Sequence, residues 1–329
     1  MSEWRDAVHR QPGNLAAAAE AFADAIAELD LETLRRGTIV FAGIGASAHA
    51  LIPAVLALRA AGRRAFALQA TELDGGAGAD PRKLADAFVL VSQSGASTET
   101  VAALERIQGV PMVAISARGD SPLAEAAHAW LPLGPEPDTP VATLSYTATL
   151  QALGMLCDAL LDRTGSVWQA LPSLAQEVLQ DSAERAAERA EAFAQVAAVE
   201  AIGGGPGLAS ARETALLARE ALRLPSTGMD TREYLHGPLE AVAPGFGAVI
   251  FGRERERSLA TSMSSFGAEV LLVGDRNAEV PGVTLPEVPP IAAPILQILP
   301  VQLLVDEVAS RRGLTIGELR RHQDDTKVA

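Results

Sequence analysis

Hydroxyl side chains gather between an apolar segment and a helix-like segment in the first half of the chain. The run reads Ser92-Gln93-Ser94-Gly95-Ala96-Ser97-Thr98-Glu99-Thr100. Hydroxyls and free N–H groups at a helix start suit a phosphate monoester, because its oxygens accept several hydrogen bonds and its charge favours the positive end of the helix dipole. A simple helix cap would explain one or two of these residues. It leaves Ser92, Gln93, Ser94 and Ser97 without a role, so the run predicts a phosphate site.

A second candidate ligand-binding loop follows an earlier apolar segment. Its sequence is Gly43-Ile44-Gly45-Ala46-Ser47-Ala48. It satisfies the G-x-G-x-x-A form of the dinucleotide fingerprint, a pattern with many false positives. A tight turn with close helix packing explains it equally well. The serine-rich run weighs against a dinucleotide, because a ribose and a pyrophosphate do not need a second cluster of hydroxyls.

The elements that must position these loops alternate between short apolar segments and helix-like stretches. Such alternation predicts parallel sheets covered on both faces, because parallel strands need long crossover connections. Ligands then bind beyond the carboxyl ends of the strands, where both loops lie. Strands are expected at residues 38–42, 65–70, 87–92, 112–117 and 129–133, and again at 197–203, 247–252 and 269–274. Helices are expected at 14–31, 143–162, 172–196, 208–222, 255–266 and 295–312.

These patterns predict an α/β fold with two related lobes, each a mostly parallel sheet flanked by helices, joined by long helices. At about 150 residues per domain, 329 residues also favour two domains. The predicted limits are a helical segment at 1–36, a phosphate-binding domain at 37–165, a connecting helix at 166–195, and a second domain with a C-terminal tail at 196–329.

The serine-rich run and the glycine loop together resemble a known family. A strand followed by Ser-Gln-Ser-Gly and a further hydroxyl residue, with Gly-x-Ser after an earlier strand, is similar to the sugar isomerase (SIS) domain. The two-lobed arrangement resembles the isomerase half of glucosamine-6-phosphate synthase. The resemblance implies that the sugar phosphate contacts Gly45, Ala46, Ser47, Ser92, Gln93, Ser94 and Ser97. The family's usual threonine is replaced here by Ala46, so one hydroxyl contact is lost.

The resemblance also implies three catalytic residues. The stretch Ala215–Glu220 is similar to the helix that carries the family's isomerising carboxylate, placed here at Glu220. His236, within Leu-His-Gly-Pro-Leu, matches the histidine that opens the sugar ring, commonly in the neighbouring subunit's site. Lys327 resembles the lysine that forms a Schiff base with the open-chain sugar. One departure stands out: Leu217 replaces the lysine that the synthase has three residues before its carboxylate.

These residue types suit proton transfer between adjacent carbons. Interconversion of an aldose and a ketose moves a proton between C1 and C2, which one carboxylate with a pKa nearer neutrality than about 4.3 performs well. Imidazole titrates near working pH, so His236 suits proton transfer during ring opening. An ordinary surface glutamate and a loop histidine held by a backbone bond are the alternatives without chemistry. The other histidines show no paired spacing typical of a metal site, and we expect neither a metal nor a cofactor.

Composition indicates which classes of partner and which cellular compartment to expect. With 27 Lys and Arg against 41 Asp and Glu, the formal charge of −14 argues against nucleic-acid binding. The single Cys157 cannot form an intramolecular disulfide, which favours a reducing cytoplasm, and we expect it to be a small buried hydrophobe. The N-terminus lacks the apolar stretch of a signal peptide. The apolar run at 291–305 contains Pro294 and Pro300, so we expect no membrane span.

Three functions follow as hypotheses. The first is isomerisation of a hexosamine 6-phosphate or a fructosamine phosphate coupled to release of ammonia or another amine, by a glutamine-independent deaminase or deglycase. The second is a simple aldose–ketose sugar-phosphate isomerase, which Leu217 supports. The third is a sensor that binds a sugar phosphate without catalysis. Glu220 and His236 favour the first, and the absence of a glutaminase half favours deamination over synthesis. A homodimer is expected, because a histidine shared between subunits would require one. Which sugar epimer binds and which amine leaves depend on a few hydrogen bonds that sequence does not define.

Overall fold

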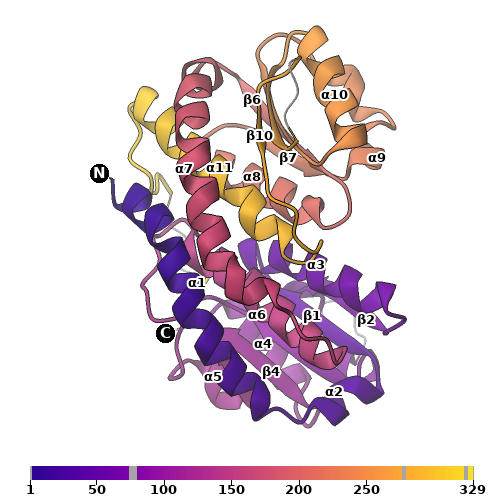
Figure 1. The fold of residues 1–329 in the computed structure, drawn as a ribbon. Helices are drawn as coiled ribbons and strands as arrows, with labels where there is room; N and C mark the ends of the chain where they lie inside the picture. Colours follow the sequence, from indigo (N-terminus) through magenta and orange to yellow (C-terminus); the bar gives the residue numbers. More distant parts are fainter. Residues whose placement is uncertain (1, 74–79, 276–278, 322–324, 329) are drawn as a thin grey trace. The chain divides into compact units, whose positions relative to one another are not determined.

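The computed structural model describes residues 2–73, 80–275, 279–321 and 325–328, and it divides into two compact units. Each unit is described by itself (Figure 1). The first-lobe unit comprises Gly13–Pro137, Leu144–Leu171 and Arg320–Ala329. The second-lobe unit comprises Met1–Pro12, Asp138–Thr143 and Pro172–Leu319. The domain limits proposed from the sequence stay a prediction.

The first-lobe unit is built on a five-stranded sheet in the order β2-β1-β3-β4-β5, with every neighbouring pair parallel. Three central strands bury all five of their residues, as expected for a sheet covered on both faces. The strands are β1 (Ile39–Gly43), β2 (Ala65–Gln69), β3 (Ala87–Val91), β4 (Met112–Ser116) and β5 (Ala129–Pro132). Its helices are α2 (Leu31–Arg36), α3 (Ala46–Ala60), α4 (Thr98–Arg106), α5 (Pro122–Ala126) and α6 (Leu144–Leu160), with short 3-10 turns η1 (Ala70–Glu72) and η2 (Pro81–Lys83).

Chain order creates a crevice between β1 and β3. The chain leaves β1 to form β2 on one side and then returns to form β3 on the other. Loops that follow strands on either side of such a reversal diverge, and this opening is where ligands bind in open parallel sheets. Gly43 and Val91, the last residues of β1 and β3, are partners in the sheet register, so the loops after them are neighbours.

The second-lobe unit repeats this plan with the strand order β10-β9-β8-β6-β7, again parallel throughout. Its helix α10 packs against β8 and β9, and α8 packs against β6, β7 and β8. The strands are β6 (Ala198–Gly203), β7 (Ser226–Met229), β8 (Phe246–Phe251), β9 (Glu269–Gly274) and β10 (Gly282–Thr284). The helices are α8 (Gly207–Glu220), α9 (Thr231–Tyr234), α10 (Glu254–Ser265) and α11 (Ala293–Arg311), with the 3-10 turn η3 (Pro238–Ala241).

Two long helices, α1 (Glu3–Ala27) and α7 (Val167–Ala194), contribute residues to both units. The predicted start of α1 at residue 14 was wrong, because the helix continues through Pro12. Proline lacks the N–H that would bond the carbonyl of Val8. The side-chain amide of Gln11 donates to that carbonyl instead, at 3.2 Å, which removes much of the penalty.

The predicted α/β fold with two parallel sheets is confirmed, with two short strands missed. The strand β7 has the sequence STGM, and β10 has three residues, so neither carries a run of apolar residues long enough to identify it. The helix predicted at 295–312 is present as α11, which runs through Pro300. By length and composition α11 would pass for a membrane-crossing helix, yet 83% of its apolar window is buried inside the protein, as in a core helix.

Cys157 lies in α6 with no exposed surface and donates to the carbonyl of Ala54 at 3.6 Å. Burial raises the pKa of its thiol. The prediction of a buried hydrophobe is therefore confirmed.

Candidate functional site

The glycine loop after β1 turns directly into α3. Gly45 precedes the helix with a φ of +57°, a conformation that favours glycine. A side chain at Gly43 would lie 3.0 Å from both the Cβ of Ser47 and the carbonyl oxygen of Val91, so the backbone of β1 approaches its neighbours closely here. Ala46 and Ser47 form the first turn of α3 and keep part of their surface in solvent. The loop therefore presents Gly45, Ala46 and Ser47 at the crevice edge of the sheet.

The serine loop, residues 92–97, follows β3 and is organised by its own hydroxyls. The hydroxyl oxygens of Ser92 and Ser97 lie 2.9 Å apart, and Ser94 accepts a hydrogen bond from the N–H of Ala96. Ser97 occupies the position before α4, yet its side chain makes no capping bond to the helix. The capping explanation therefore fails for Ser97. Its hydroxyl and that of the buried Ser92 form a pair.

Gly95 fixes the shape of the serine loop. Its φ is +66°, and a side chain there would come within 2.0 Å of the hydroxyl oxygen of Ser121. Gln93 is exposed, whereas Ser94 is partly exposed. Gly95 thus allows the loop to pack closely against Ser121, while Gln93 and Ser94 remain accessible to solvent.

The C-terminal tail pairs with this same loop, within the first-lobe unit. Thr98 donates its N–H to the carbonyl of Thr326 and its hydroxyl to the carbonyl of Asp325, at 3.2 Å and 2.7 Å. Val328 donates to the carbonyl of Ala96 at 2.9 Å. These bonds make an antiparallel bridge between Ser97 and Lys327. The backbone thus holds Lys327 directly beside the serine loop, and Lys327 is exposed to solvent.

The sequence contains two lysines, Lys83 and Lys327. Lys83 ends a 3-10 turn on a different loop of the first-lobe unit. An amine beside the serine loop is therefore an uncommon feature of an otherwise arginine-rich chain.

Glu220 is the last residue of α8 in the second-lobe unit. Its residue is exposed, but partial desolvation of the carboxyl, together with the negative charge of Glu213, raises its pKa to about 7. A carboxyl near this pKa both accepts and returns protons at neutral pH.

Glu213 was missed by the sequence analysis. It lies two helical turns before Glu220, so both face the same side of α8, and it is 1% exposed. The fully buried Leu217 lies between them on this face. The seven-residue spacing of two glutamates on an otherwise apolar helix face was the signal available in the sequence.

His236 is exposed in the loop between α9 and η3. The carboxylate of Asp230 caps α9 by accepting from the N–H groups of Arg232 and Glu233. His236 donates its own N–H to the carbonyl of Glu233 at 3.0 Å, and Gly237 then turns the chain with a φ of +138°. This backbone bond and the turn at Gly237 hold His236 in an exposed position.

The structure therefore brings the predicted residues together in two sets. The first-lobe unit gathers Lys327 and all seven proposed contacts, Gly45, Ala46, Ser47, Ser92, Gln93, Ser94 and Ser97. Glu220 and His236 belong to the second-lobe unit, at the end of α8 and after α9. Among the described residues, no three His, Cys, Asp or Glu side chains are placed to hold a metal ion.

Sequence comparison finds similarity in the part of the chain that contains the serine loop. Residues 34–162 match the SIS domain. The isomerizing glutamine–fructose-6-phosphate aminotransferase of Gloeobacter violaceus is 27% identical over 255 residues, which cover 70% of this chain and 42% of that enzyme. The corresponding enzyme of Methanothermobacter thermautotrophicus is 29% identical over 299 residues, covering 84% of this chain and 49% of the enzyme. The chain thus spans less than half the length of these relatives.

Solved structures share the two-lobed fold. The C-terminal domain of glucosamine-fructose-6-phosphate aminotransferase from Francisella tularensis superposes with a TM-score of 0.81 at 18% identity, over 96% of this chain and 98% of that one. Glucosamine-6-phosphate deaminase from Thermotoga maritima gives a TM-score of 0.80 at 21% identity, over the full length of both chains. At these identities the likeness establishes the fold.

Proposed function

This chain carries a SIS domain at residues 34–162 within a two-lobed SIS fold, and from that premise we propose that it is an amino-sugar-phosphate isomerase that releases an amine. Its substrate is a hexosamine 6-phosphate or a fructosamine phosphate, and it needs no glutamine. The observation that carries this choice is the backbone bridge between Ser97 and Lys327, which brings a lysine residue next to the hydroxyl-rich serine loop.

In this proposal the serine loop binds the phosphate. The hydroxyls of Ser92, Ser94 and Ser97 and the N–H groups at the start of α4 donate to phosphate oxygens. The amide of Gln93 is a further contact to the phosphate, and the loop from Gly45 to Ser47 contacts the sugar. Lys327 forms a Schiff base with the open-chain sugar at the step that expels the amine.

Glu220 moves the proton. Its carboxylate takes the proton from C2 of the open-chain amino sugar and returns it to C1, which converts the C2 amine to an imine. The amine of Lys327 then adds to that imine and displaces ammonia, which leaves a Schiff base between Lys327 and C2. Water hydrolyses this Schiff base, which releases the ketose phosphate and restores the free amine of Lys327. A carboxyl with a pKa of about 7 suits both halves of this transfer. His236 assists ring opening, and we propose that it acts in the site of a second subunit, in a cytoplasmic homodimer.

The decisive experiment measures ammonia or amine release from a panel of 2-amino and 1-amino hexose 6-phosphates. The purified protein is compared with Glu220→Gln, and with Glu184→Gln as a matched surface control on α7. Release that disappears only in Glu220→Gln supports the proposal and identifies the sugar.

The same samples distinguish the alternatives. Aldose–ketose interconversion of unaminated hexose 6-phosphates without any amine release favours a simple isomerase, which the apolar Leu217 beside Glu220 would suit. Saturable binding of a sugar phosphate without turnover favours a sensor. Either result overturns the assignment of an amine-releasing enzyme.

A further inference from the structure

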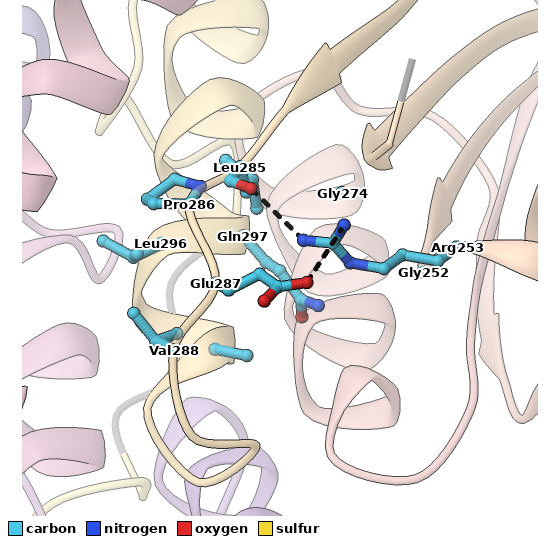
Figure 2. Close-up of a pocket in the computed structure, with 10 residues that line it drawn as sticks. Gly252, Arg253, Gly274, Leu285, Pro286, Glu287, Val288, Leu296 and Gln297 are labelled. Atoms are coloured by element: carbon cyan, nitrogen blue, oxygen red, sulfur yellow. Dashed lines mark hydrogen bonds and ion pairs between the residues drawn. The ribbon is translucent and has the colours of Figure 1, made fainter. Parts of the chain in front are cut away.

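A pocket lies in the second-lobe unit, and neither Glu220 nor His236 lines it. It has a volume of about 240 Å³ and opens at the carboxyl ends of β8 and β9, beside the first half of α11. Drug-sized ligands occupy pockets of roughly 300–1,000 Å³, so an occupant must be smaller. Figure 2 shows Arg253, Glu287 and Gln297 converging on this space.

Glycines at the strand ends leave the room that forms the pocket. Gly252 follows β8 and Gly274 ends β9, and both adopt positive φ values, +152° and +132°. A side chain at Gly274 would lie 2.7 Å from the carbonyl oxygen of Gly252, so only glycine fits this contact. The backbone of the two strands therefore forms one wall.

Arg253 supplies a permanent positive charge at the pocket. Its guanidinium donates to the carbonyl of Leu285 at 3.3 Å and lies 3.9 Å from the carboxylate of Glu287. The Glu287 side chain is 90% exposed, so this ion pair is weak and easily exchanged. Guanidinium groups bind carboxylates and phosphates through two parallel hydrogen bonds, which makes Arg253 available to a better anion.

Gln297 offers a neutral donor on the opposite wall. Its Oε1 accepts from the hydroxyl of Ser210 at 2.7 Å, which fixes the orientation of the amide. Its Nε2 makes no hydrogen bond to any part of the chain that the structure describes. The pocket thus combines one cation with one oriented neutral donor.

The position of Arg253 in the sheet repeats that of a proposed ligand residue in the other unit. Ser92 and Gln93 follow β3, and Gly252 and Arg253 follow β8, the strand in the same place of the second sheet. At the first position after the strand, glycine in the second unit replaces serine in the first. At the next position, a charged arginine replaces a neutral glutamine.

We propose that this pocket is a second ligand site, which takes a small organic anion through its phosphate or carboxylate group. Arg253 binds the anionic group in place of Glu287, and the Nε2 of Gln297 donates to an oxygen at the other end of the ligand. This site is separate from the serine loop, so the inference stands whether or not the proposed catalysis is correct.

The test follows backbone and side-chain amide signals by ¹H–¹⁵N NMR of the full-length, deuterated protein. Inorganic phosphate, glucose 6-phosphate and citrate are titrated separately at constant ionic strength, and the amides of Gly252, Gly274 and the side chain of Gln297 are observed. Phosphate and citrate distinguish the two kinds of anionic group.

Four variants test whether Arg253 and Glu287 control binding at this pocket. Arg253→Gln removes the charge, and we expect at least tenfold weaker binding. Glu287→Gln removes the competing carboxylate, and we expect tighter binding. Arg255→Gln, on a neighbouring exposed arginine, and Ser97→Ala, at the serine loop, should leave these shifts unchanged.

The outcomes decide the proposal. Saturable shifts with any probe that follow this order of variants support it. The absence of saturable shifts with all three probes would overturn it, as would equal affinities in Arg253→Gln and the unmodified protein. Shifts that vanish only in Ser97→Ala would assign the anion to the serine loop instead.

Discussion

Glu213 lies two helical turns before Glu220 on the same face of α8, and its charge adds to the desolvation that raises the Glu220 pKa to about 7. Leu217, fully buried, occupies the turn between them. Two carboxylates on one helix face repel each other, which favours the protonated form of Glu220. This arrangement gives Glu220 a titration that an isolated surface glutamate lacks.

The raised pKa makes the stability of the protein depend on pH through Glu220. A carboxyl with a higher pKa in the folded state contributes stability that is fully present below the unfolded value, near 4.5. That contribution is lost as pH rises through about 7. We expect the Tm of the unmodified protein to fall relative to that of Glu220→Gln between these values, measured by calorimetry. Glu184→Gln is the control, and parallel Tm curves for all three proteins would contradict the raised pKa.

Removing the Glu213 charge should move the pH–rate profile. In Glu213→Gln the like charge is gone, so the pKa of Glu220 falls and its base form persists to lower pH. The acid limb of kcat/KM, expected near pH 7 in the unmodified enzyme, should therefore shift to lower pH. An acid limb that stays in place, in a variant that folds normally by circular dichroism, would show that Glu213 does not tune Glu220.

Loss of a serine-loop hydroxyl should weaken substrate binding. Ser97→Ala removes one partner of the Ser92–Ser97 pair and one donor to the phosphate. A hydrogen bond to a charged group contributes about 1.5–3 kcal/mol, which predicts a Kd for the sugar phosphate about 10- to 100-fold higher. Calorimetric titration measures this, with Ser264→Ala on the exposed surface of α10 as the control. Unchanged affinity in Ser97→Ala would remove the phosphate from this loop.

Lys327 allows a direct chemical test of amine participation. Borohydride reduction during turnover should attach one sugar phosphate per chain, and peptide mass spectrometry should locate it on Lys327 rather than Lys83. Lys327→Arg keeps the charge but cannot form the Schiff base, so it should show no adduct. Lys83→Arg should label normally. Label on Lys83, or none with an active substrate, would exclude the proposed role of Lys327.

Mixing two inactive variants tests whether His236 acts in the active site of the partner subunit. If His236 acts in the partner's site, heterodimers of His236→Asn and Glu220→Gln contain one intact site. Random mixing then restores about one quarter of the unmodified activity, since half of the dimers carry one working site of two. Mixing is done under mild denaturation and refolding, with each variant refolded alone as the control. Recovery no greater than in these controls would place His236 outside a shared site.

Local sequence patterns predicted most of the helices and strands, but they did not predict elements whose formation depends on contacts with other parts of the chain. Fully buried strands such as β3 carry continuous apolar runs, so β3 was found within one residue of its observed end. Strands β7 and β10 are short and were missed, because pairing with neighbours rather than their own composition defines them. The path of α1 through Pro12 depends on the Gln11 side chain, which no propensity anticipates.

The sequence by itself determined the two parallel sheets, the serine loop after β3 and the glycine turn before α3, because hydrophobic periodicity and turn chemistry act over a few residues. Only the tertiary structure decided that the Ser97 hydroxyl bonds Ser92 instead of capping α4, and that the tail brings Lys327 beside Ser97. It also decided the Glu220 pKa, which depends on burial and on Glu213. These contacts join residues whose proximity depends on how the chain packs, and packing is a property of the folded unit.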